Sequence, residues 1–324
     1  MTAPPHTPPA LPVLACGEIR TCVLPSLNPL DARAATQLLR LRPDERVLVS
    51  ERPNLYVRSP QTLTGVDCRM PTSNGAKVRV VGTVAGRAAL TEGRILQSSA
   101  YVRALARGPE RRRPWGHYLI QPGVLEPLGR LPEREAAQGV LAGACPGSGE
   151  LDLGLIADGI LTSLLRHPLL DQKAPLKSRH TRLRWAARQT EPEDQGPAIE
   201  EFTLAEDDLR TVRLRVPADT DPAAVAALCE DLALHDWLLT TVVRLLDGRL
   251  GPAEGPDALT ALRPAVEHLM HLWMPAARGD HALRGLWDVL ERNPGFTRQW
   301  DNLVQRIRDR LALLNALPRQ PIGP

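Results

Sequence analysis

The chain has 324 residues, of which 43% are hydrophobic and 24% are charged, as is usual for a globular protein. This length suggests two domains, and the formal net charge of +3 does not by itself indicate a nucleic-acid partner. No uninterrupted apolar run approaches the roughly 18 residues of a spanning helix, so we expect no membrane segment.

The cysteines indicate a reducing compartment. They are scattered and odd in number, at Cys16, Cys22, Cys68, Cys145 and Cys229. None of their spacings is that of a C-x-x-C or zinc motif, so we predict reduced thiols, with Cys16, Cys22 and Cys229 as small buried residues. We also expect no signal peptide, because residues 1–10 lack both a basic and an apolar stretch. The predicted location is therefore the cytoplasm.

The first part of the chain predicts a β-rich domain over residues 13–140, preceded by a disordered Pro-rich tail at 1–12. A short helix capped by Asp31 is expected over 31–41, and residues 106–116 are expected to form an exposed loop. The predicted strands are residues 14–24, 46–50, 55–58, 77–90 and 94–105, the last two joined by a turn at 91–93.

A stretch rich in Gly, Ala and Pro at 139–150 predicts a domain boundary. The second domain is expected over residues 150–318, beginning with an apolar helix at 151–165. Three antiparallel strands are then predicted over residues 181–189, 199–204 and 209–216, because apolar and polar residues nearly alternate.

The clearest element is a helix over residues 221–246. Asp221 is a favourable N-cap, and Pro222 suits the first helical position. Apolar residues recur at spacings of three and four and extend over a second face, which predicts a buried helix. Further helices are predicted over 257–273, 280–291 and 297–317, with a frayed tail at 319–324. The predicted fold class is thus α+β: a β-rich N-terminal unit, then a small antiparallel sheet packed on a C-terminal helical bundle.

Two Arg-rich segments, residues 103–118 and 173–188, carry the strongest binding signal. Arginine offers paired donors to phosphate, and aromatic rings can stack on bases. The candidate phosphate or nucleic-acid residues are Arg111, Arg112, Arg113, Trp115, Arg179, Arg182 and Arg184. We favour the alternative, a solvated surface whose arginines pair with the acidic stretches 191–194 and 205–208, because no known nucleic-acid motif is present.

The C-terminal helical region holds Trp273, Trp287 and Trp300. Their helical spacing is more typical of a core, and the alternative is a surface for a protein partner. His268 and His271 lie one helical turn apart. They lack the H-E-x-x-H pattern and any supporting cysteine pair, so we predict no metal site.

No motif of a known chemistry is present. Glycine-rich phosphate loops and the G-x-S-x-G turn are both missing, so we predict no catalytic residues and no cofactor. An enzyme with an unfamiliar site near Asp67, Cys68 and His117 stays open as an alternative.

Three stretches together resemble an uncharacterised family of actinobacterial cytoplasmic proteins, over about residues 14–247. They are LTGVDCRMPTSNGAKVRVVGTVAGRA (63–88), RRRPWGHYLIQPGVLEPLG (111–129) and LCEDLALHDWLLTTVVRLLD (228–247). The function of that family is unassigned, so the resemblance implies no catalytic residues. It does imply a gene neighbourhood with a variant P-loop protein and a methyltransferase, and hence a multi-protein system.

Three functions follow from these observations. The first is a non-enzymatic interaction or scaffold subunit of a cytoplasmic complex, with a protein partner. The second is a nucleic-acid or phosphate-ligand binder that uses the two Arg-rich segments. The third is an enzyme with an unrecognised site.

Overall fold

The computed structural model describes residues 14–143, 149–174, 178–190, 197–217, 220–247, 267–277, 283–292 and 294–316. The tails predicted at 1–12 and 319–324 lie outside these residues, as does most of the helix predicted over 257–273.

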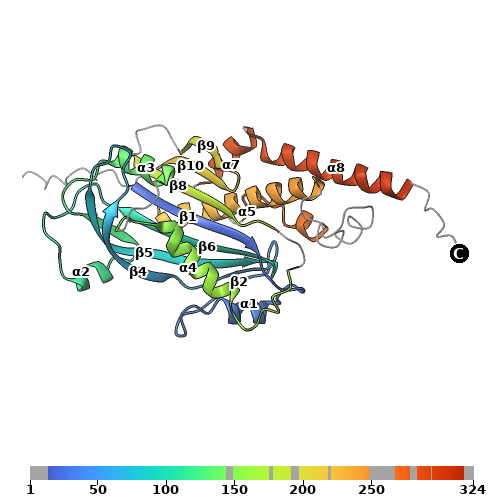
Figure 1. Cartoon of the computed structure of the whole chain (residues 1–324), viewed down its shortest axis with the longest axis horizontal. Coiled ribbons are helices and arrows are strands. Elements are labelled where there is room, and N and C mark those ends of the chain that lie inside the picture. The colour runs from blue at the N-terminus through green and yellow to red at the C-terminus, as the bar shows by residue number, and fades with distance from the viewer. Residues whose placement is uncertain are drawn as a thin grey trace, which may run out of the picture.

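In the described part of the chain, ten strands form one mixed sheet (Figure 1). The strands are β1 (Leu14–Val23), β2 (Leu48–Ser50), β3 (Tyr56–Arg58), β4 (Thr62–Met70), β5 (Val78–Thr91), β6 (Ile95–Ala104), β7 (Val124–Pro127), β8 (Thr181–Thr190), β9 (Ala198–Glu206) and β10 (Leu209–Pro217). Their order is β2-β3-β5-β7-β6-β1-β8-β10-β9, with β4 beside β5 and β5 also beside β6. β1 therefore lies inside the sheet, antiparallel to β6 on one side and to β8 on the other.

Helices cover both faces of this sheet. They are α1 (Ala32–Leu38), α2 (Trp115–Leu119), α3 (Glu133–Ala142), α4 (Leu153–Leu165), α5 (Pro222–Leu246), α7 (Arg284–Arg292) and α8 (Phe296–Ala316). Successive side chains of a strand point to opposite faces. Ala15 and Ile19 of β1 accordingly pack in the cluster that contains α5, whereas Cys16 packs in the cluster that contains α4. Figure 1 shows α4 in front of the sheet, α5 behind it and α8 running past its end.

The structure confirms the predicted cap of the first helix, the hairpin of β5 and β6, and the helix α4. It also contains four elements that the sequence analysis did not predict, namely β4, β7, α2 and α3. β7 and α2 are too short to establish a periodic pattern, with four and five residues. β4 is exposed over residues 63–65, and its apolar alternation is limited to Val66, Cys68 and Met70, which is too short to predict a strand.

The predicted small antiparallel sheet needs correction. Its three strands form, but β10 lies between the other two, parallel to β8 and antiparallel to β9. Because β8 pairs with β1, strands from both predicted domains, 13–140 and 150–318, join one sheet. The prediction placed the middle strand in sequence, β9, between β8 and β10. In the structure β10 lies between them, and β9 is at the edge of the sheet. The domain boundary at 139–150 stays a prediction.

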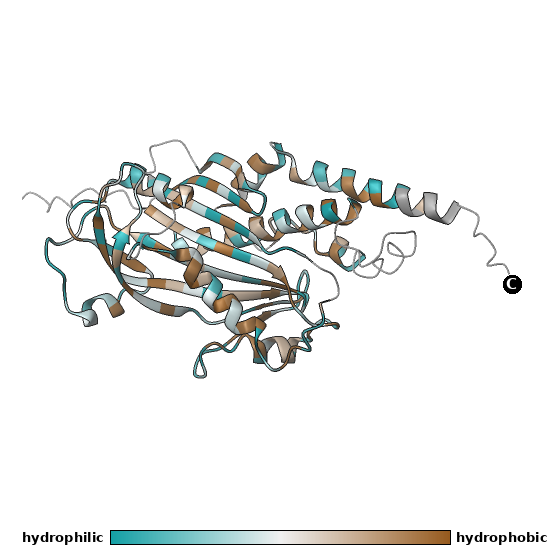
Figure 2. Cartoon of the chain, viewed as in Figure 1, coloured by the Kyte–Doolittle hydropathy of each residue, from teal (hydrophilic) through white to brown (hydrophobic). Residues whose placement is uncertain are grey.

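The long helix predicted from Asp221 is confirmed and buried. The Asp221 carboxylate accepts a hydrogen bond from the Ala223 amide at 2.9 Å, and Pro222 begins α5. Trp237 and Leu238, in its middle, have no exposed surface. α5 packs between the sheet and the C-terminal helices, whose buried residues belong to the same cluster. Figure 2 shows the alternating apolar and polar surface of α8 that this packing requires.

A buried ion pair fixes α5 on the sheet. The guanidinium of Arg87 on β5 donates to both carboxylate oxygens of Glu230, at 2.7 and 2.9 Å. Ser99 donates to the same carboxylate at 2.5 Å, and Gln97 donates to the Glu230 backbone carbonyl at 2.9 Å. Desolvating two charges is costly, and only such additional hydrogen bonds with good geometry offset the cost.

We predict that Glu230→Leu lowers the free energy of unfolding by about 3–5 kcal/mol, because it leaves the Arg87 charge buried without its partner. The double variant Arg87→Met/Glu230→Leu should recover most of that loss. Urea unfolding of the wild type and the three variants measures the effect. Glu45→Gln, which disrupts the exposed pair of Glu45 with Arg42, should change stability by less than about 1 kcal/mol. A double variant as unstable as Glu230→Leu would contradict this account.

Candidate functional site

The structure places the candidate arginines of the two Arg-rich segments apart. Arg111, Arg112 and Arg113 precede α2, which packs on β5. Arg182 and Arg184 lie on β8, and in the sheet β6 and β1 lie between β5 and β8. These two groups of arginines therefore form separate surfaces, although Arg107 and Arg188, which belong to the same two segments, line one cavity.

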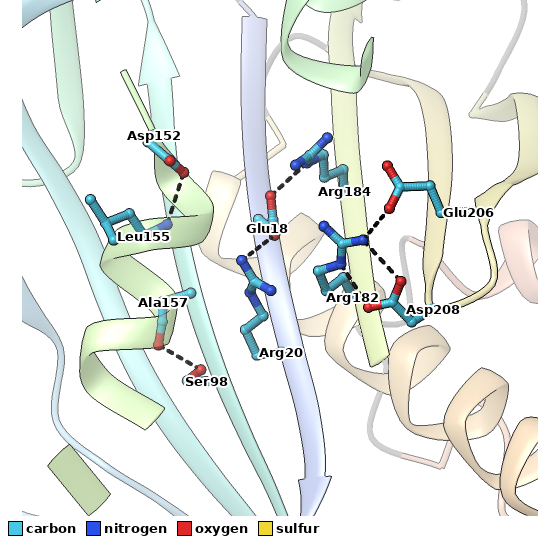
Figure 3. Close-up of polar contacts among 10 residues, drawn as sticks. All are labelled: Glu18, Arg20, Ser98, Asp152, Leu155, Ala157, Arg182, Arg184, Glu206 and Asp208. Atoms are coloured by element: carbon cyan, nitrogen blue, oxygen red, sulfur yellow. Dashed lines mark hydrogen bonds and ion pairs between the residues drawn. The ribbon is translucent and has the colours of Figure 1, made fainter. Parts of the chain in front are cut away.

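The arginines of β8 are neutralised by nearby carboxylates (Figure 3). Arg182 donates to both carboxylate oxygens of Asp208, at 3.0 and 2.9 Å, and to Glu206 at 2.5 Å. Arg184 donates to Glu18 of β1 at 2.6 Å. The exposed Arg179 contributes its backbone carbonyl, which accepts a hydrogen bond from Trp237 at 3.2 Å. We had expected the arginines of this segment to pair with the acidic stretch 205–208, and Arg182 does so. The pairing of Arg184 with Glu18 was not predicted.

Glu18 lies at the centre of a buried polar network under α4. Arg20 approaches its second carboxylate oxygen at 3.0 Å, and Figure 3 shows Glu18 between Arg20 and Arg184. α4 can pass this close because residue 154 is glycine: a Cβ there would lie 2.6 Å from the Glu18 carboxylate. The adjoining cavity has a volume of about 50 Å³, which suits a few water molecules and no organic ligand. We therefore assign this network to the joining of α4, β1 and β8.

A different environment surrounds the arginines before α2. Arg112 approaches Asp67 of β4 at 3.2 Å, and its guanidinium lies 5.0 Å from the centre of the Trp115 ring. Arg79 of β5 binds Asp67 with two hydrogen bonds, at 2.7 and 2.9 Å. One carboxylate thus serves two arginines, while Arg111 and its neighbours stay exposed. This surface has an excess of positive charge.

α2 itself is anchored by polar contacts on its inner side. His117 lies 2.7 Å from Glu126 of β7, with Arg113 3.4 Å from the ring. The buried hydroxyl of Tyr118 accepts a hydrogen bond from the Arg113 amide at 2.9 Å. These contacts hold the helix against the sheet and leave its outer side facing solvent.

The outer side of α2 carries large apolar side chains. Trp115, Leu119 and Ile120 are 38%, 58% and 76% exposed. The Trp115 ring lies over Gly65 of β4, where a Cβ would be 3.3 Å away, and Leu63 is exposed two residues along the strand. We call these residues, with Arg79 and Arg111–Arg113, the α2–β4 surface. Of its members, the sequence analysis singled out only the three consecutive arginines and Trp115.

The alternative catalytic set of Asp67, Cys68 and His117 is not assembled. Asp67 and Cys68 are neighbours on β4 and so point to opposite faces, and Cys68 packs against the cluster that contains α4. Burial, with a smaller effect of Asp67, raises the pKa of the Cys68 thiol to about 11, so it is protonated and a weak nucleophile. His117 binds Glu126 and not these residues.

The tryptophans proposed as a partner surface pack with one another. Trp273 stacks on Trp300 at 4.5 Å between ring centres, and both Trp300 and Trp287 are buried. His235 of α5 contacts the edges or faces of Trp273 and Trp287, at 4.9 and 5.4 Å. This packing attaches the C-terminal helices to α5. A role for this tryptophan cluster in binding a partner stays a prediction.

We predict that Asp67 stays ionised at a lower pH than an ordinary aspartate, because the Arg79 hydrogen bonds lower its pKa. A lowered pKa means that the pair stabilises the fold above about pH 4 and that this contribution is lost as the pH falls through the lowered pKa. Carboxyl ¹³C NMR measures the titration. Arg79→Gln should raise the Asp67 pKa more than Arg112→Gln does, and an ordinary value in the wild type would contradict the prediction.

Within the described residues, no helix is long and apolar enough to cross a membrane, and no group of three or more His, Cys, Asp or Glu side chains is placed to hold a metal ion. Comparison of the chain with protein families, with curated proteins and with solved structures finds no match.

Proposed function

We propose that this chain is a non-enzymatic interaction subunit of a cytoplasmic multi-protein system, and that it binds an extended acidic segment of a partner protein along β4. The observation that carries the proposal is the α2–β4 surface, where exposed apolar side chains, an excess of arginines over carboxylates and the edge of a sheet occur together. The cysteines that the structure describes are free thiols, and Cys16, Cys22 and Cys229 are buried, which supports a reducing location.

β4 offers an open backbone edge. At one end its Arg69 amide and carbonyl bind Gly149 and Leu151, at 2.9 and 2.8 Å. By strand alternation, Leu63 and Asp67 direct their amides and carbonyls to the same side, where no described residue pairs with them. An exposed strand edge of this kind is a template for an added strand from another chain.

The side chains around this edge specify the partner's chemistry. Leu63, Trp115 and Leu119 provide an apolar contact of the type that anchors protein interfaces. Arg79 and Arg111–Arg113 surround it and are opposed by Asp67, which supports recognition of carboxylates in the partner. An acidic segment with apolar residues at alternate positions satisfies both features.

The geometry favours a protein over a nucleic acid. Arg182 and Arg184 of β8 already have carboxylate partners, so among the candidate arginines of the two segments the group at 111–113 is the main one left for phosphates. Exposed aliphatic residues such as Leu119 and Ile120 add nothing to phosphate binding, whereas a protein partner would bury them. The partners implied by the family resemblance, a variant P-loop protein and a methyltransferase, are the first to test.

We predict that a photo-crosslinking amino acid at Ile120 captures a partner protein in native host cells, whereas the same amino acid at the exposed Leu155 of α4 does not. With the captured protein purified, Leu119→Asp should weaken binding at least about tenfold, because it places a charge that repels an acidic segment in an apolar contact. Calorimetric titration measures the affinity.

Leu204→Asp is the matched control, since Leu204 on β9 is as exposed as Leu119, at 58%. It should leave the affinity unchanged. Equal capture at positions 120 and 155, recovery of nucleic acid instead of protein, or equal affinity of Leu119→Asp and the wild type would each contradict the proposal.

A further inference from the structure

A second feature is a cavity between β3, β6 and the N-terminal end of α5. Its volume of about 470 Å³ is within the range of small-molecule sites. Arg46, Arg58, Gln61 and Tyr101 are among the polar residues that line it, and Leu48 and Ala224 are among the apolar ones. The cavity therefore offers both polar and apolar contacts to a ligand.

The charged residues of the cavity that have no partner among the described residues are both positive. Arg87 lines it but is bound to Glu230, and Asp221 lines it but caps α5. Arg46 and Arg58 form no ion pair or hydrogen bond with any other residue that the structure describes. Two guanidinium groups are thus available to an anion.

Tyr101 supplies a polar group to the cavity. Its side chain is only 4% exposed, and its ring lies 5.4 Å from the guanidinium of Arg87, which fixes its position. No hydrogen bond connects its hydroxyl to another described residue, and the hydroxyl is not among the fully buried atoms, so a bound molecule can reach it. Burial raises the pKa of Tyr101, so the hydroxyl stays protonated and can donate.

We propose that this cavity binds a small organic phosphate. Arg46, Arg58 and Tyr101 come from three different segments and offer donors to three phosphoryl oxygens, whereas a carboxylate has only two oxygens. The cavity is larger than a phosphate group, and Leu48 and Ala224 provide an apolar wall for the organic part. The site is independent of the α2–β4 surface and does not require a partner protein.

Phenyl phosphate is the probe, and its ³¹P NMR signal is followed as the purified full-length chain is added. We expect saturable binding that weakens at least about tenfold in Arg58→Gln and in Arg46→Gln, since each loses a charge-assisted hydrogen bond. Tyr101→Phe should also weaken binding. Arg46 is exposed, so its variant is expected to fold, and the melting temperature of each variant checks this.

Arg33→Gln, on the exposed side of α1, removes the same charge elsewhere and should bind like the wild type. Inorganic phosphate and benzoate should both bind more weakly than phenyl phosphate. The proposal is overturned if phenyl phosphate does not bind the wild type at about 10 mM, well above the range of ordinary ligand affinities. Unchanged affinity in the folded Arg46→Gln and Arg58→Gln variants, or equal binding of inorganic phosphate or benzoate, would also overturn it.

Discussion

The buried contact between Arg87 and Glu230 is the constraint on which the rest of this structure depends. Two charges removed from water require close and complete pairing, and this requirement permits one position of α5 over β5 and β6. Two further polar residues of α5, Asp231 and His235, form hydrogen bonds with the C-terminal segment. Asp231 accepts a hydrogen bond from the Ala276 amide at 2.9 Å, and His235 accepts one from the Met274 amide at 3.2 Å. α5 thereby connects the sheet to the C-terminal segment.

The position of α5 has consequences for both proposed sites. Its N-terminal end lies against β3 and β6, where it completes the cavity lined by Arg58 and Tyr101. The α2–β4 surface differs from the cavity in that it is open to solvent, because β4 is an edge strand and α2 covers little of it. The interior is thus specified by close pairing, while the edge of β4 and the apolar residues beside it stay exposed.

The difference between the two Arg-rich segments lies in the carboxylates around them. On β8, register places Arg184 directly opposite Glu18 of β1, and the turn before β10 supplies Asp208 to Arg182. Before α2, a single carboxylate, Asp67, serves Arg79 and Arg112 together. Two segments of similar arginine content, with five arginines in 103–118 and four in 173–188, therefore produce a positive surface in one place and a neutral one in the other.

The sequence was sufficient to predict elements with a strong local pattern. The cap at Asp221 and the aliphatic period of α5 are local, and both were predicted correctly. The pairing of Arg87 with Glu230 joins residues 143 positions apart, so no spacing rule could reveal it. The insertion of β10 between β8 and β9 likewise depends on long-range pairing. The candidate sites depend on exposure and on such distant contacts, which is why only Arg111–Arg113 and Trp115 of the α2–β4 surface, and no residue of the cavity, were found beforehand.

Native-state hydrogen exchange, followed amide by amide, tests the central claim most directly. If α5 is held inside the molecule by its ion pair and its apolar contacts, the amides around Leu232 and Leu238 exchange only through global unfolding. Their exchange free energy then equals the unfolding free energy from urea, whereas amides of the β4 edge exchange at much lower cost. Exchange of the α5 amides by local opening, well below the global unfolding free energy, would contradict the account.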